Sequence, residues 1–135
     1  FWILIMANPN IVNVTTIYGN TTYYTPSGTT AVVLLANAAS SGIVNKIDNV
    51  VATNVTATTA TATVSIYTNG AVAQGSAPSG GTAYPIIFQV PVPGNSAVVV
   101  VDKSTAFYLQ EGTSISVTSG TASAITFTTS YEAIS

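Results

Sequence analysis

The stretch at 125–132 reads ITFTTSYE, and its period of two is the clearest structural signal in the chain. Side chains in a β-strand point alternately to opposite faces. One face of this stretch carries the larger side chains and the other carries smaller polar ones: Ile125, Phe127, Thr129 and Tyr131 against Thr126, Thr128, Ser130 and Glu132. β-Branched and aromatic residues also favour strands. The stretch therefore predicts a strand with one face buried.

Similar signals recur toward the N-terminus, as alternating or apolar runs at 11–18, 29–36, 43–55, 63–68, 84–92, 97–101, 107–109 and 115–117. In the run at 43–55, Asp48 and Asn49 interrupt the apolar pattern, which predicts a bulge or bend. Prolines within 84–92 predict an edge strand, because proline cannot donate a hydrogen bond to a neighbour. Four consecutive valines at 97–101 favour a central strand.

Turn residues separate these runs, notably Gly19-Asn20, the cluster at 37–42, Asn69-Gly70 and the loop at 75–81. About eight or nine strands, spaced by turn signals, are typical of a sandwich or jelly roll. The predicted fold is all-β, a single antiparallel β-sandwich of jelly-roll type. The 135 residues are enough for one such domain, placed at 7–135 and preceded by a short extension at 1–6.

Charge is scarce, since only six of the 135 residues are charged and His, Cys and Arg are absent. An ordinary soluble domain is about a quarter charged. Two lysines cannot neutralise a row of phosphates, so the sequence argues against nucleic-acid binding. No apolar run approaches the ~20 residues that a membrane-spanning helix needs. A surface with so little charge has also lost the usual protection against self-association.

The same composition argues against an enzyme and predicts no cofactor and no metal. Acid–base catalysis needs titratable groups held close together, whereas the four carboxylates are expected to lie scattered at strand corners and near the C-terminus. Ser and Thr are plentiful but have no histidine base, only Lys46 or Lys103. Asp48-Asn49 or Asp102 would supply only part of a calcium shell. We therefore expect these carboxylates to be turn or surface residues that face water.

An apolar extension opens the chain, with Phe1, Trp2, Ile3, Leu4, Ile5 and Met6. One interpretation is that the first five residues come from an upstream reading frame, because Met6-Ala7 resembles a natural start. Another is a strand exchanged with a neighbouring subunit, since six residues span about 20 Å as a strand. A signal-peptide remnant fits less well, because no basic segment precedes the apolar run. The extension is a candidate subunit contact.

Two further sets of residues are candidate sites. Tyr18, Tyr23 and Tyr24 are expected to cluster around one loop, where aromatic rings would contact a sugar or another subunit. The sequence also has three triplets that match the N-glycosylation pattern, starting at Asn13, Asn20 and Asn54. These triplets matter only in an extracellular protein of an N-glycosylating organism.

Several segments share a pattern with a known group of proteins. They are Met6-Ala7-Asn8 with the run at 11–19, the turn at 37–42 leading to Lys46-Ile47, the run at 90–93, the run at 108–115 and the terminal 130–135. Together they resemble small β-sandwich virion proteins of tailed phages of marine cyanobacteria and related hosts, over most of 6–135. In those relatives an Asp follows the Leu-x-Glu-Gly turn, whereas this chain has Thr113. The resemblance implies a structural role in a particle.

Three classes of function follow from these observations. The leading hypothesis is a non-enzymatic virion structural protein, a capsid decoration or head-associated subunit that binds itself and a major capsid or other virion protein. The second is a subunit of an extracellular filament, assembled when the extension at 1–6 enters a groove of the next subunit. A tail or neck component and a carbohydrate-binding module are the remaining alternatives.

Overall fold

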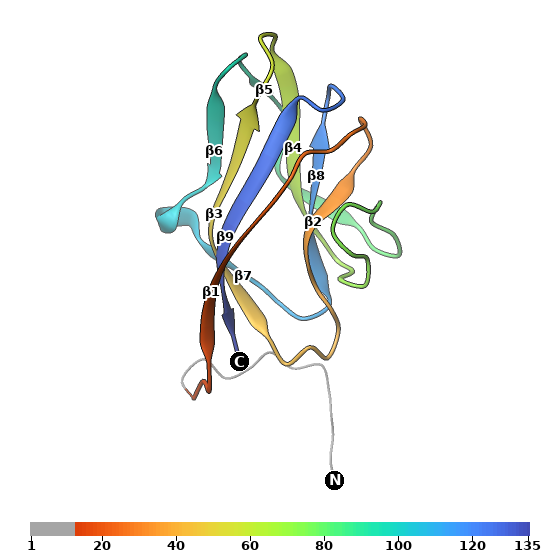
Figure 1. Cartoon of the computed structure of the whole chain (residues 1–135). Coiled ribbons are helices and arrows are strands. Elements are labelled where there is room, and N and C mark those ends of the chain that lie inside the picture. Colours follow the sequence, from red (N-terminus) through yellow and green to blue (C-terminus); the bar gives the residue numbers. More distant parts are fainter. Residues whose placement is uncertain (1–12) are drawn as a thin grey trace.

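The computed structural model describes residues 13–135, which form two antiparallel sheets packed face to face (Figure 1). Strands make up 55% of the described residues. A single 3-10 helix, η1 (Lys103–Thr105), accompanies the nine strands of these residues. The strands are β1 (Ile17–Tyr24), β2 (Val32–Asn37), β3 (Val44–Asn54), β4 (Ala60–Tyr67), β5 (Ala83–Val92), β6 (Ala97–Val101), β7 (Phe107–Leu109), β8 (Thr113–Ser119) and β9 (Ile125–Ile134).

The strand order is that of a jelly roll. One sheet has the order β1-β9-β3-β6, with β7 also paired to β3, and the other has the order β2-β8-β4-β5. First and last strands pair, and the pairing continues inward: β1 with β9, β2 with β8, β3 with β6 and β7, and β4 with β5. Strands β6 and β7 share one position in this scheme, with η1 between them. The predicted all-β sandwich of eight or nine strands is confirmed.

The C-terminal strand β9 lies between β1 and β3 and contributes the centre of the core. Ile125 and Phe127 are fully buried, and the intervening residues on the opposite face are only partly covered. Thr129 is also buried, and its hydroxyl donates to the Asn49 carbonyl at 2.8 Å. The alternation in the sequence is therefore the alternation of burial, with the one polar inward residue hydrogen-bonded.

Strand β3 has a bulge at the predicted position. Ile47 pairs with Tyr131 and Asn49 pairs with Ser130, so Asp48 is the extra residue. An extra residue shifts the alternation by one. Ile47 and Val50 consequently both remain buried, while Asp48 and Asn49 are both partly exposed. The Asn49 side chain accepts a hydrogen bond from the Ser130 backbone N–H at 3.1 Å, which stabilises the irregular pairing.

Two buried asparagines connect the sheets. Asn37 is the last residue of β2, and its amide donates to the Leu109 carbonyl of β7 at 3.0 Å. Asn54 is the last residue of β3, and its amide donates to the Val92 carbonyl of β5 at 2.9 Å. In each case the strand end belongs to one sheet and the acceptor to the other. The two side chains therefore join the two layers through hydrogen bonds inside the protein.

Two sequence predictions about the strands are wrong. The first strand begins at Ile17 and contains Gly19-Asn20, because its partner β9 ends at Ile134, opposite Ile17. The run at 97–101 forms an edge strand, since valine favours extended backbone whether or not it is covered. Asn69-Gly70 separates two strands as predicted, without forming a tight hairpin. It lies in the long connection between β4 and β5, where the Asn69 side chain bonds Ala71 N–H and the Ser79 carbonyl.

Gly70 is the glycine whose replacement we expect to be harmful. A Cβ at this position would meet the backbone carbonyls of Asn37 and Thr113, which cannot move without disturbing the β2–β8 pair. Gly70→Ala is expected to lower the free energy of unfolding by about 1–3 kcal/mol through overpacking. Urea unfolding measures this change. Gly28→Ala is the matched control, because a Cβ there meets nothing within 4 Å; equal effects at both positions would refute the steric explanation.

Candidate functional site

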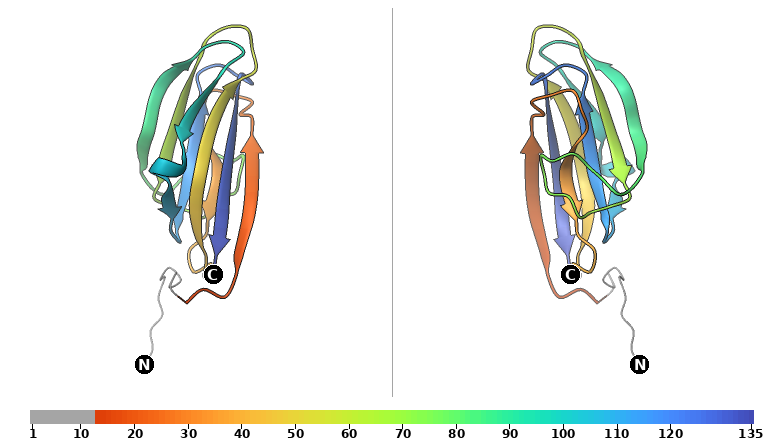
Figure 2. Two further views of the ribbon diagram at one scale, coloured as in Figure 1. Left: turned by 90° about the vertical axis from the view of Figure 1, so that its left-hand side faces the viewer. Right: turned by 90° about the vertical axis from the view of Figure 1, so that its right-hand side faces the viewer.

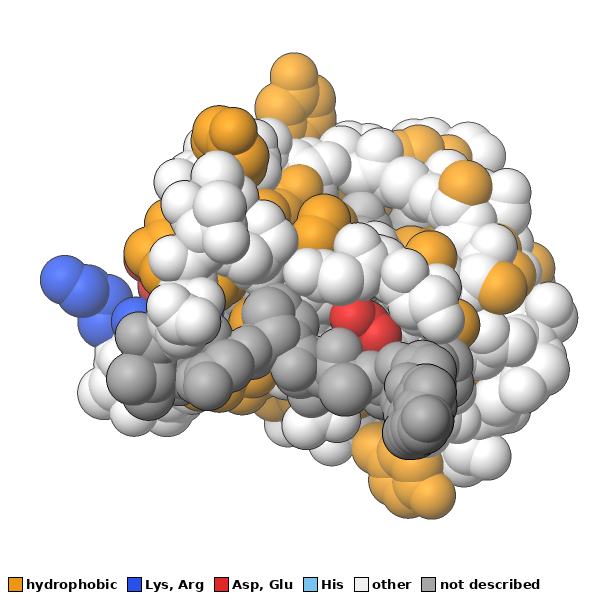
Figure 3. Space-filling model, turned by 90° about the horizontal axis from the view of Figure 1, so that it is seen from below, with side chains coloured by type: hydrophobic (Ala, Val, Ile, Leu, Met, Phe, Trp, Pro, Cys, Tyr) orange, Lys and Arg blue, Asp and Glu red, His pale blue; other side chains and the backbone are white. Residues whose placement is uncertain are grey.

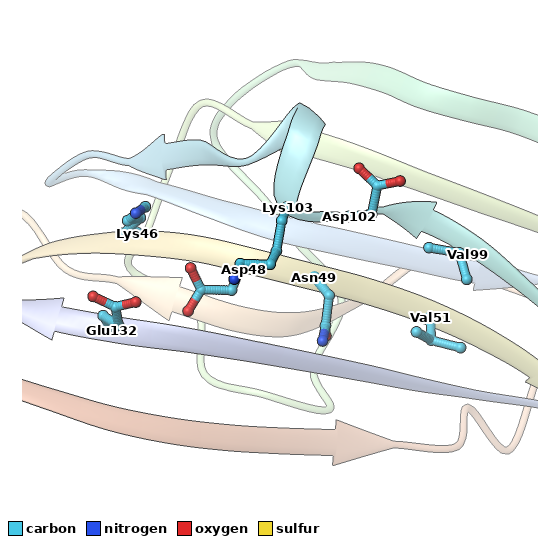
Figure 4. A pocket seen from close by; sticks show the side chains of 8 residues that line it. All are labelled: Lys46, Asp48, Asn49, Val51, Val99, Asp102, Lys103 and Glu132. Atoms are coloured by element: carbon cyan, nitrogen blue, oxygen red, sulfur yellow. The ribbon is translucent and has the colours of Figure 1, made fainter.

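Five of the six charged residues of the chain line a single hollow on the β1-β9-β3-β6 sheet (Figure 4). Its open volume is about 650 Å³. Three carboxylates and two ammonium groups contribute to its wall, together with one amide and two valines: Lys46, Asp48, Asn49, Val51, Val99, Asp102, Lys103 and Glu132. The prediction that the carboxylates are scattered is therefore wrong for three of the four.

The pairing of the strands explains why these charges meet. Lys46 on β3 lies directly opposite Glu132 on β9, so that unlike charges face each other across the two strands. Asp48, two residues beyond Lys46 on β3, lies beside them, and the end of β6 brings Asp102 and Lys103 from the other side. The Lys103 side chain extends from η1 over β3 (Figure 4). Residues far apart in sequence thus form one mixed-charge surface.

Asp102 caps η1 and remains ionised at neutral pH. Its carboxylate accepts hydrogen bonds from the Ser104 hydroxyl at 2.6 Å and from the Ser104 backbone N–H at 2.9 Å. These bonds favour the charged form, and the hydroxyl bond is the main reason that the pKa of Asp102 lies below its ordinary value. The Thr105 hydroxyl in turn accepts from the Asp102 N–H at 3.0 Å, which completes a capping box.

The hollow brings charged groups of both signs together, and Glu111 lies apart from them. Within residues 13–135, no three His, Cys, Asp or Glu side chains come close enough together to hold a metal ion. The remaining charged residue, Glu111, lies elsewhere and accepts a hydrogen bond from the Gly42 backbone N–H at 2.8 Å. The hollow therefore combines three negative and two positive side chains on a surface that otherwise carries little charge.

Exposed apolar side chains gather on the edges of the sandwich instead. On β5, Tyr84 and Phe88 are 60% and 64% exposed, and Ile86 between them is also exposed. β6 contacts β5 along the same side, and it adds the exposed Val99. The lower end of the molecule shows mostly uncharged polar surface with separate apolar side chains (Figure 3). The large exposed residues of β5 were not anticipated, because an apolar run in a strand normally predicts burial.

The three candidate tyrosines lie along β1 rather than around one loop. Tyr18 pairs with Ala133 and Tyr24 with Phe127, on the face toward the second sheet, whereas Tyr23 projects from the opposite face. Tyr24 packs against the core, while Tyr18 and Tyr23 are exposed. The expected aromatic cluster for a sugar is therefore not formed by these residues.

The glycosylation triplets differ in accessibility. Asn13 and Asn20 are exposed. Asn54 is only 1% exposed, and its amide nitrogen donates to both the Thr58 and the Val92 carbonyls. A glycan at Asn54 would have to displace these bonds, so the folded structure argues against that position. The proposed contact at Phe1, Trp2, Ile3, Leu4, Ile5 and Met6 lies outside the described residues.

Comparisons with protein-family models, with curated proteins and with solved structures found no significant match to this chain. No helix within residues 13–135 has the length and apolar character to cross a membrane.

Proposed function

We propose that the chain is a non-enzymatic virion structural protein, a capsid decoration or head-associated subunit of a tailed phage. One observation carries this proposal: charge is collected in one hollow and at Glu111, while the edges of the sandwich expose large apolar side chains. The resemblance of the sequence to small virion proteins of tailed phages supports a place in a virus particle. The double-sheet jelly roll is an architecture that viral capsid domains use.

The distribution of charge suits a protein whose faces are covered by neighbours. Burying an unpaired ion costs several kcal/mol, whereas threonine, serine and asparagine surfaces can hydrogen-bond across a contact. Edges with exposed Tyr84 and Phe88 can bury aromatic area, which contributes strongly to interfaces. The hollow with Asp48 and Glu132 would be the surface that stays in water or that contacts a partner of complementary charge.

The virion proposal predicts that the chain is present in intact particles. Virions produced by the genome that encodes it would be purified by density gradient and analysed by mass spectrometry. We expect the chain at a copy number that is a simple fraction of the major capsid protein, and immunogold labelling on the head. Intact particles without the chain would refute the proposal.

A subunit of an extracellular filament is the second candidate, and the open edge of β1 favours it. A strand donated by residues 1–6 of the next copy would need such an edge. Electron microscopy of the purified chain separates the two candidates, because a donated strand generates an unlimited head-to-tail fibre. If fibres form, a variant without residues 1–5 is expected to lose them; fibres that persist would exclude strand donation.

A further inference from the structure

Each sheet of the described sandwich has two edges, formed by β1 and by β6 with β7 in one sheet and by β2 and β5 in the other. An outer strand presents unpaired backbone groups, and proteins usually block such edges with prolines, bulges, charges or covering loops. The four edges of this chain differ sharply in this respect.

A loop covers the edge of β2. The Val33 N–H donates to the Ser76 carbonyl, and the Gly75 N–H donates to the Val33 carbonyl, both at 2.9 Å. The Gln74 side chain adds a bond to the Leu34 carbonyl at 2.9 Å. The backbone groups of Val33 and the Leu34 carbonyl are thus occupied from within the same chain.

Irregular backbone blocks the edges of β5 and β6. Pro85 and Pro91 lack N–H groups, and the β4–β5 register shifts on both sides of Val64. Gln89 has a positive φ of 50°, which interrupts the extended conformation of β5 further. Strand β6 has only five residues, its register against β3 shifts between Val50 and Val51, and η1 follows it.

The edge of β1 has no proline, charge or bulge, and the loop that covers β2 reaches it only at Thr22 and Tyr23. All eight residues pair with β9 in an unbroken register, and none is proline or charged. β1 lies at the outer margin of its sheet, with no further strand of the described residues beyond it (Figure 2). From the loop that covers β2, the Gln74 amide donates to the Thr22 hydroxyl at 2.8 Å and, at 3.4 Å, to the Tyr23 carbonyl.

We propose that β1 pairs antiparallel with β1 of a second copy of this chain, around a two-fold axis at Thr21. This inference deepens the proposed function and rests on it, because it names the contact through which the structural subunit associates with itself. The two β1-β9-β3-β6 sheets then become one continuous sheet. The partner is a second copy because β1 has no charge, so identical strands meet without like-charge repulsion.

The sequence of β1 also fits this register. With Thr21 opposite Thr21, Gly19 lies opposite Tyr23 on the outer face, where an aromatic ring can cover the bare glycine backbone. On the other face, Tyr18 lies opposite Tyr24, and cross-strand aromatic pairs stabilise sheets. In this register odd-numbered residues lie opposite odd-numbered ones and even-numbered residues opposite even-numbered ones. The inward face of one copy therefore continues as the inward face of the other.

Cysteine cross-linking tests the register directly, because the chain contains no cysteine of its own. Opposite Cα atoms in an antiparallel pair are about 4.5–5.5 Å apart, within the range of a disulfide. Thr21→Cys is expected to give a covalent dimer on mild oxidation of a dilute solution. Val55→Cys is the matched control, at an exposed position in the β3–β4 loop, and is expected to remain mostly monomeric. Equal cross-linking at both positions would overturn the proposal.

Charge substitution tests the two-fold axis. Thr21→Lys and Thr21→Glu should each raise the dimer dissociation constant roughly tenfold or more, because two like charges face each other. Mixing the two variants should restore the dimer, which sedimentation would detect, while Val55→Lys, in the exposed β3–β4 loop, should dimerise like the parent chain. Circular dichroism confirms that each variant is folded. Variants at Thr21 that associate normally, or no rescue on mixing, would overturn the inference.

The competing occupant of the edge is the extension at 1–6 of another copy. Removal of residues 1–6 should leave the dimer intact; loss of the dimer would assign the edge to that extension and overturn the β1 pair. Failure of this inference is distinguishable from failure of the proposed function. A chain found in virions but monomeric in sedimentation refutes only the β1 contact, whereas a dimer absent from virions refutes only the virion role.

Discussion

Phe127→Ala is expected to lower the free energy of unfolding by about 3–5 kcal/mol. Phe127 is fully buried on β9, between β1 and β3, and it is among the largest side chains of the core. Its removal loses the transfer free energy of the ring and leaves a cavity that the two sheets cannot close, since both are fixed by their own hydrogen bonds. Urea denaturation followed by circular dichroism measures the change.

Phe88→Ala provides the matched control for this substitution. Phe88 is 64% exposed on the β5 edge, so the same change of side chain is expected to alter stability by less than about 0.5 kcal/mol. A similar loss at both positions would mean that the core does not lie where the structure places it.

Asn54→Ala is expected to cost about 2–4 kcal/mol, although it removes only one small polar side chain. The Asn54 amide donates to the Thr58 carbonyl at 2.7 Å and to the Val92 carbonyl at 2.9 Å. Its carbonyl oxygen accepts from the Thr56 N–H and hydroxyl. Alanine leaves the buried Val92 carbonyl without this partner and frees the end of β3 from the second sheet. Asn20→Ala, at an exposed position, is the control.

Asn54→Asp separates the two functions of this side chain. The carboxylate keeps the acceptor but replaces the donors with a buried negative charge facing a carbonyl oxygen. Burial would raise the pKa of the new carboxyl above its unfolded value of ~3.9. The unfolded state then binds fewer protons, so stability falls as pH rises from that value through the folded pKa. We expect the variant to be closer to the parent chain at pH 4 than at pH 7; the reverse order would contradict the assignment.

The features that the sequence predicted well are those determined within a single strand. The alternation in β9 specified which of its residues are buried, and Asp48-Asn49 correctly indicated the bulge in β3. Proline placed β5 at an edge, where the structure has it. In each case the structure follows from the period of two of strand side chains or from the missing N–H of proline. Both causes act over a few neighbouring residues.

The features that were missed depend on which strands become neighbours. The hollow requires β3, β9 and the end of β6 side by side, and nothing local to Lys46 or Asp102 indicates that pairing. The start of β1 is determined by where β9 ends. Asn54 resembled a surface glycosylation site because an Asn-x-Thr triplet looks the same whether its asparagine is exposed or, as here, buried and hydrogen-bonded.

The nested pairing of the jelly roll also has a consequence for how the chain folds. Ile17 pairs with Ile134, so the outermost ladder joins residues from nearly opposite ends of the described chain. Closing so large a loop has a high entropic cost before any contact forms, and proteins dominated by such distant pairs fold in milliseconds to seconds. Until β1 docks, the backbone groups at the edge of β9 are unpaired and can pair with a strand of another molecule, including its β1. Slow closure of this ladder makes strand exchange between newly made chains a competing route during synthesis.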